Sequence, residues 1–233
     1  MEKSSLYVEF SRYKQRIPLD TMIHFHTYTN ILSEKKFGIK VRNSIFGRKQ
    51  EENIHMYGNV YIIFPIGDYR LFFTPLVRDF TMYYETDTSP FVVLSRLSLK
   101  LFDDMTPATN IKQKAGTELL EIPMHSPEQF RKELNLTIKS IAQQFVESAT
   151  EFFDGDLKYT KETIYQKVHQ EFNNKYDSIE SYVRDMKSVK NLDNIDNEEI
   201  MIDCDKCIGI DASIAKSFFA ELKKRYKNNR ETT

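Results

Sequence analysis

The chain has 233 residues, of which 40% are hydrophobic and 29% are charged, and its formal net charge at pH 7 is −1. That size and composition are typical of a globular protein with one large domain or two modest ones. A near-neutral molecule has no overall attraction to nucleic acid or to an anionic membrane. No apolar stretch reaches the roughly 18 residues of a transmembrane helix, and the first residues contain no apolar core of a secretory signal.

The cysteine count and the residue bias bear on where the protein resides. Two cysteines without an export signal indicate a reducing, intracellular setting rather than a disulfide scaffold. Lys, Asn, Ile and Tyr are abundant, a bias that suits the AT-rich coding sequences of many phages, viruses and low-GC bacteria. We therefore expect a soluble protein in an intracellular or cytoplasmic location, or in the virion if the protein is viral.

The first half of the chain carries the alternation of half-buried strands. In residues 6–10, the apolar Leu6, Val8 and Phe10 alternate with a tyrosine and a glutamate, which is the period of two that a strand requires. Residues 17–31 place five apolar side chains on one face at the same period and are rich in Thr and Ile. We therefore predict a strand for residues 17–31 also.

Residues 54–102 are a series of short β-type runs, "VYIIFPI", "YRLFFTPL", "RDFTMYYE" and "FVVLSRLSLKLF". Turn-like residues at 67–68 and 86–90 separate the runs. Such short spacing favours an antiparallel meander, because parallel pairing needs a longer crossover. Pro65 and Pro75 cannot donate to a strand ladder, so we expect them at strand ends, at bulges or on an edge.

The second half carries the period of amphipathic helices. Ser126, Pro127 and Gln129 have the pattern of an N-cap, a first-turn proline and a capping-box partner. Apolar residues then recur at steps of three and four from Phe130 to Phe152. Gly155 supplies a left-handed residue to end this helix.

Two further helical patterns follow. One covers residues 164–186, with a second start at 177–180 as an alternative, and another begins at Asp211. Residues 188–203 are polar and acidic without a period, so we predict a connector there. The whole pattern predicts an α+β protein with an antiparallel β-rich region at residues 1–110 and a helical region at residues 121–233. These regions form either two domains or one α+β domain.

The seven glycines exclude several common catalytic motifs, because no two of them are fewer than nine positions apart. Neither a phosphate-binding loop nor a Gly-x-Ser-x-Gly nucleophile turn can be written with that spacing. Residues 203–214 begin like a calcium loop but lack the glycine at the sixth position and the acid at the twelfth. We therefore predict that the protein is not an enzyme and has no resident cofactor, with zinc as the exception considered next.

The two cysteines are three positions apart, which is the spacing of half a zinc site. Among the histidines, only His24 and His26 have ligand spacing, and on a strand they would point the same way. One hypothesis is therefore a zinc site built from His24, His26, Cys204 and Cys207. In the simpler interpretation the cysteines are small buried hydrophobes. Redox activity is less favoured, because the flanking aspartates would raise the thiol pKa.

Charge is distributed unevenly along the chain. Residues 35–49 contain six basic residues and no acid, with aromatic and apolar residues between them, a pattern that can hold single-stranded nucleic acid. The six are Lys35, Lys36, Lys40, Arg42, Arg48 and Lys49. The C-terminal helix adds six more basic residues, whereas residues 193–211 carry seven acids and one lysine. In the alternative interpretation these segments are solvated faces or helix ends.

The aromatic-rich segment 69–84 is typical of either a sheet core or an exposed protein-binding face. Our leading prediction is a non-enzymatic interaction or assembly protein, as a phage or viral structural or host-interacting component. Its partner would be another protein or a second copy, not a membrane. The alternatives are a nucleic-acid-binding protein that uses residues 35–49 and the C-terminal helix, and a zinc-dependent fold or enzyme.

Overall fold

A computed structural model describes residues 7–11, 23–49, 59–80, 90–111, 126–193, 195–196 and 198–231. The chain forms two compact units. Unit 1 comprises residues 1–15, 43–78 and 187–233, and unit 2 comprises residues 16–42 and 79–186. Each unit therefore contains residues from both halves of the chain.

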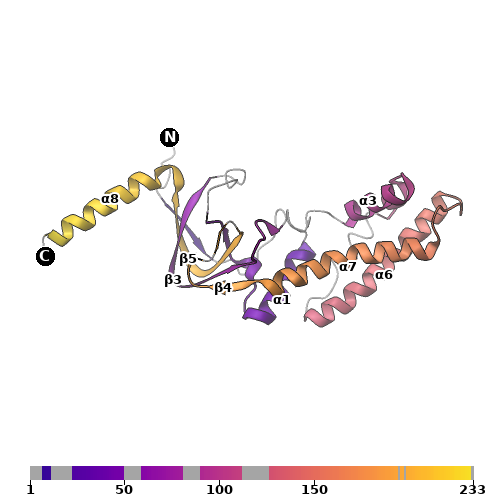
Figure 1. The fold of residues 1–233 in the computed structure, drawn as a ribbon, viewed down its shortest axis with the longest axis horizontal. Helices are drawn as coiled ribbons and strands as arrows, with labels where there is room; N and C mark the ends of the chain where they lie inside the picture. The colour runs from indigo at the N-terminus through magenta and orange to yellow at the C-terminus, as the bar shows by residue number, and fades with distance from the viewer. Residues whose placement is uncertain are drawn as a thin grey trace. The chain divides into compact units, whose positions relative to one another are not determined.

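Unit 1 is built around one antiparallel sheet of five strands. The strands are β1 (Tyr7–Ser11), β2 (Ile45–Gly47), β3 (Tyr61–Phe73), β4 (Lys187–Val189) and β5 (Ile200–Asp211). The central strand β5 pairs with β3 along one edge and with β1 and β2 along the other, while β4 pairs with the end of β3. Helix α8 (Ala212–Glu231) follows β5 directly and runs away from the sheet (Figure 1).

One face of this sheet forms the core of unit 1. Its buried members are Leu71, Phe73, Ile195, Ile200, Ile202, Cys204 and Cys207. Strand β3 is irregular between Ile66 and Tyr69, where the two residues 67–68 lie opposite the single residue Asp205 of β5. Gly67 has a φ of +78° there, which a side chain would strain.

Unit 2 is helical. It contains α1 (Ile23–Phe37), α3 (Pro90–Phe102), α4 (Thr106–Thr109), α6 (Pro127–Phe152) and α7 (Lys161–Asp185). The short 3₁₀ helix η1 (Val41–Asn43) lies where the chain passes from unit 2 to unit 1. The long helices α6 and α7 pack on each other, and α1 packs on both.

The predicted ends of α6 are confirmed. The Ser126 hydroxyl accepts a hydrogen bond from the backbone N–H of Gln129. The predicted apolar stripe is buried from Phe130 to Ala149, whereas its last member, Phe152, is 43% exposed. After the last turn, Gly155 has a φ of +81° and its N–H donates to the carbonyl of Thr150. The two hydrogen-bonded ends explain why local sequence was sufficient to locate this helix.

The mixed α+β class and the antiparallel sheet are confirmed, but the order of elements agrees only in part. The predicted strand at 6–10 is β1, and the helix predicted to begin at Asp211 is α8. The second helix, α7, runs without a restart through residues 177–180. Residues 67–68, predicted as a turn, instead form the bulge within the single long strand β3.

The strand predicted for residues 17–31 is wrong from residue 23 onward, where α1 begins. Residues 17–22 lie outside the described part. Helix α1 buries several small polar side chains, and these satisfy themselves locally: Thr29 donates to the Phe25 carbonyl and Ser33 to the Asn30 carbonyl. Because polar residues share the buried face, the helix has no apolar stripe for a sequence reading to detect.

Two further predictions need correction. The run 91–102 is the helix α3 rather than a strand, because a continuous apolar run has no period that separates the two. The connector predicted for residues 188–203 contains part of β4 and the start of β5, where Ile200, Met201 and Ile202 are buried. Residues 54–58 and 81–89 of the predicted meander lie outside the described part of the chain.

Candidate functional site

The face of the sheet opposite the core of unit 1 carries exposed apolar side chains. Directly paired residues on antiparallel strands share a face, so the pairing places three rows side by side: Tyr7, Ile210 and Ile62; Glu9, Ile208 and Phe64; Ser11, Lys206 and Ile66. We call these nine residues the outer sheet face. Ile62, Phe64 and Ile66 are 40%, 36% and 46% exposed, well above what a strand facing a core would show.

Helix α8 extends this apolar surface. The Phe219 ring lies 5.6 Å from the Phe64 ring, centroid to centroid, and Ala215 is buried. Leu222, one turn further along, is 47% exposed. Spacings of four and three put Ala215, Phe219 and Leu222 on one stripe of the helix. We call this stripe, together with the outer sheet face, the docking surface.

Three lysines accompany the stripe on α8. Lys216 and Lys223 are seven positions apart, so they lie on the same side of the helix and next to the stripe, while Lys224 lies further round. All three are exposed. Within the described residues, none of them takes part in an ion pair or a hydrogen bond. The free ammonium groups give this end of unit 1 a positive rim beside an apolar stripe.

Part of the predicted nucleic-acid segment is engaged within unit 2. The Lys35 ammonium pairs with Glu128, and Lys36 donates hydrogen bonds to the carbonyls of Val183, Arg184 and Met186, at 3.0, 2.6 and 2.8 Å. These carbonyls lie at the C-terminal end of α7, where the negative end of the helix dipole favours a cation. Burial lowers the pKa of Lys36. Both lysines therefore have partners within unit 2.

The other four basic residues of this segment also have surroundings of their own. Lys40 lies 3.7 Å from the Glu34 carboxylate, and Arg42 is only 3% exposed, with its guanidinium 4.7 Å from the centre of the Phe80 ring. In unit 1, Lys49 donates to the carbonyls of Leu192 and Ile195, and Arg48 makes interactions as well. The segment is thus divided between the two units. Nucleic-acid binding by it stays a prediction.

The acidic segment 193–211 is likewise used inside unit 1. The two oxygens of Glu198 accept from the backbone N–H groups of Leu76 and Asp196. Asp203 pairs with Arg70 at 3.1 Å. Asp211 accepts from the N–H and hydroxyl of Ser213 and so caps α8, which lowers the pKa of its carboxyl. Three acids of the segment therefore stabilise turns, strands and a helix end.

The predicted zinc ligands are distributed over two units. Cys204 and Cys207 lie in β5 of unit 1 with their sulfur atoms 2.7 Å apart. His24 and His26 lie in α1 of unit 2, where a helix replaces the strand that would have aimed both side chains the same way. His26 is buried, 3.1 Å from the Asn30 amide nitrogen. The described residues contain no group of three or more His, Cys, Asp or Glu that could hold a metal, and the four-residue site remains a prediction.

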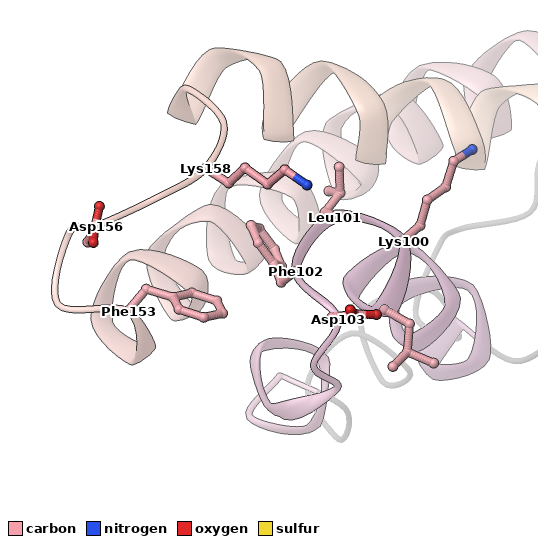
Figure 2. A pocket seen from close by; sticks show the side chains of 8 residues that line it. Lys100, Leu101, Phe102, Asp103, Phe153, Asp156 and Lys158 are labelled. Carbon is pink, nitrogen blue, oxygen red and sulfur yellow. The ribbon is translucent and has the colours of Figure 1, made fainter.

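A hollow of about 350 Å³ lies in unit 2, between the C-terminal ends of α3 and α6 (Figure 2). Lys100, Asp103, Asp156 and Lys158 line it together with Phe102 and Phe153. Figure 2 shows the Lys158 side chain extending toward Leu101 and Phe102, whereas Asp156 points away. The four charges cancel and do not converge on one point, so this hollow carries no assigned chemistry.

Comparison with protein-family models, with curated proteins and with solved structures finds no match. Among the described residues, no helix has the length and apolar character to span a bilayer.

Sequence reasoning missed the docking surface for a specific reason. In the run "YIIFPI", apolar residues point to both faces of β3. This pattern is typical of a strand that is buried on both faces, so the sequence does not indicate that one face of β3 is exposed. The lysines of α8 are visible in the sequence, but a sequence cannot show which cations find partners after folding.

Proposed function

We propose that the protein is a non-enzymatic interaction protein that binds a partner protein through the docking surface of unit 1. The observation that carries this proposal is the exposed apolar and basic surface of α8. Its apolar stripe continues onto the outer sheet face and is flanked by Lys216 and Lys223, which have no partners in the described residues. Contiguous exposed apolar surface with a polar rim is the usual property of a binding site.

The energetics of α8 support the same proposal. An isolated helix of 20 residues is only marginally stable in water, and most helices in proteins gain their stability by packing an apolar face. In the described residues, α8 contacts the sheet through the first part of its length, at Ala215 and Phe219. A partner that covered Leu222 would complete the packing.

The chemistry of α8 indicates the kind of partner. An amphipathic helix binds by laying its apolar residues into a groove, at spacings of three and four. Lysines beside the stripe favour a groove with an acidic rim, which would speed the encounter and fix the orientation. A second copy of this chain is a weaker candidate, because Glu198, Asp203 and Asp211 already have partners within unit 1. The partner is therefore proposed to be a different, acidic protein.

Photo-crosslinking tests this proposal with a matched control. A photoreactive phenylalanine analogue replaces Leu222 in one variant and Leu136, a residue of α6 that is 53% exposed, in the other. We expect an adduct to an acidic protein at position 222 only, and its loss when Lys216→Glu and Lys223→Glu are added. The binding constant of the identified protein, measured with and without these substitutions, then confirms a direct contact.

Three other results would overturn the acidic-protein proposal. An adduct only to a second copy of this chain would replace it with self-assembly. An adduct only to nucleic acid would favour the alternative function, because free lysines on α8 could also neutralise phosphates. Equal labelling at positions 222 and 136 would remove the docking surface altogether. A phage or viral setting, an intracellular or virion location, and a zinc-dependent fold remain predictions from sequence.

A further inference from the structure

The two cysteines lie in the core of unit 1, on the side of the sheet away from the outer sheet face. Cys204 is 4% exposed and Cys207 is fully buried, and both belong to the apolar core cluster. Neither residue is part of the docking surface. Their arrangement is independent of the proposed function.

This arrangement departs from regular strand geometry. Side chains three positions apart on a strand normally point to opposite faces. Here Asp205 and Lys206 are both exposed between two buried cysteines, so the alternation is broken. The cause is visible in the pairing: β3 has the two residues 67–68 opposite Asp205. On the other edge, pairing with β2 ends at Ile202 and pairing with β1 begins at Lys206.

The sulfur atoms are consequently brought very close together. Their separation is 2.7 Å, whereas unbonded carbon atoms, which are smaller than sulfur, pack at about 3.5–4.0 Å. A disulfide bond is about 2.03–2.05 Å long. Only a small movement therefore separates the two thiols from covalent contact.

We propose that Cys204 and Cys207 form a reversible intramolecular disulfide, which clamps β5 across its irregular segment 203–207. The oxidant is a small peroxide such as hydrogen peroxide. One thiol is first oxidised to a sulfenic acid, with release of one water. The second thiol then displaces the hydroxyl from that sulfur, which forms the S–S bond and releases a second water. A dithiol reductant returns both thiols.

Burial decides the rate of this reaction. Burial, together with the hydrogen bond between its thiol and Cys204, raises the pKa of Cys207 to about 12, so its thiolate is scarce at neutral pH. Oxidation then depends on local opening of β5, and strands open first where their ladders are interrupted. The site is a slow redox-sensitive clamp, and its chemistry differs from that of a reactive thiol catalyst with a lowered pKa.

The test counts thiols in the purified full-length chain. Native protein is treated with hydrogen peroxide, quenched, unfolded and alkylated with N-ethylmaleimide before intact-mass analysis. We expect a monomer without alkylatable thiols after oxidation and with both thiols restored after reduction. Oxidation should also raise the thermal midpoint of unit 1 by about 5 °C or more and slow amide exchange in residues 203–207.

The variants Cys204→Ser and Cys207→Ser are the matched controls, because each keeps one thiol and should show no such shift. If a serine variant fails to fold, the thiol count of the unmodified chain still decides the question. Two free thiols in the treated native chain would overturn the proposal if the unfolded chain oxidises under the same conditions. So would sulfinic or sulfonic acids, or only intermolecular disulfides. The crosslinking at position 222 is unaffected by any of these results.

Discussion

Residues 35–49 and the helix α8 are both basic and both contain aromatic residues, yet the folded protein uses their charges in opposite ways. In the first segment, lysines and an arginine contact carbonyls, carboxylates and an aromatic ring of the protein itself. On α8, Lys216, Lys223 and Lys224 have no such contacts among the described residues. A basic segment indicates a binding site only where its charges remain available after folding.

The basic residues of the two segments should also differ in their contribution to the stability of the fold. Cations at the ends of helices or against aromatic rings lower the free energy of the folded state, so their loss should appear in stability. Cations that extend from an exposed helix contribute little to folding, and their loss should appear in binding. Substitutions matched between the two segments can therefore confirm or contradict the comparison.

The largest loss of stability is expected for Arg42→Ala. This side chain is 3% exposed and lies against Phe80, so its removal leaves a buried gap and ends a desolvated cation–π contact. We expect unfolding free energy to fall by about 3 kcal/mol, measured by urea denaturation. The matched substitution Lys224→Ala on α8 should change it by less than about 0.5 kcal/mol. Equal effects at the two positions would contradict the comparison.

A smaller loss is expected for Lys36→Met, which keeps the apolar stem and removes the ammonium. Three carbonyls at the end of α7 then lose their donor, and the favourable interaction of a cation with the helix terminus is lost as well. We expect a decrease of about 1–2 kcal/mol in unfolding free energy. Lys40→Met is the control, because its 3.7 Å pair with Glu34 is half exposed and should matter little. If Lys36→Met left the unfolding free energy unchanged, these hydrogen bonds would not stabilise the fold.

Leu76 extends the comparison to exposed apolar residues, and here the expected effect has the opposite sign. Leu76 is 87% exposed and has a φ of +68°, a left-handed conformation that costs a branched side chain about 1–2 kcal/mol. Leu76→Gly removes this cost but adds chain entropy to the unfolded state. We expect a net gain of about 0.5–1 kcal/mol, measured by thermal and urea unfolding. The control Leu222→Gly lies within a helix and should be destabilising.

If Leu76→Gly stabilises the protein, then Leu76 lowers the unfolding free energy of the natural chain. Strained, exposed residues of this kind are often kept for a function. A destabilised Leu76→Gly variant would instead assign the side chain a packing role that its exposure does not suggest.

The elements that sequence predicted correctly have local causes. Helix α6 carries its own cap, apolar stripe and terminal glycine, and α8 follows a capping aspartate. The predictions for helix α1 and for the start of β5 were wrong, because the stability of these elements depends on contacts with residues far away in the sequence. Tyr28 of α1 packs against Phe130 and donates to Glu180, while Met201 and Ile202 pair with both β2 and β3. Local patterns cannot encode such contacts.

The candidate site was predictable to a lesser degree. Its lysines are visible in the sequence, but their availability depends on which acids and carbonyls fold near them. The outward face of β3 is hidden because apolar residues occupy both faces of the strand. Equally, the contact between the two cysteines depends on a bulge in another strand far away in the sequence, at residues 67–68 of β3 opposite Asp205. Register determines the last two features, and register is a property of the folded sheet.

The smallest effect on stability is expected for the triple substitution of Lys216, Lys223 and Lys224 by glutamine. These exposed side chains have no partner to lose in the described residues, and glutamine favours helix about as well as lysine. The unfolding free energy should therefore change by less than about 0.5 kcal/mol, while affinity for the proposed acidic partner should fall about tenfold or more, with a weaker dependence on salt. Isothermal titration calorimetry at two salt concentrations measures the affinity and its salt dependence, and urea denaturation measures the unfolding free energy. Charge-preserving substitutions to arginine serve as the control, and they should retain binding. If glutamine weakens folding and leaves binding intact, the cations of α8 belong with those of residues 35–49, and the distinction between the two segments fails.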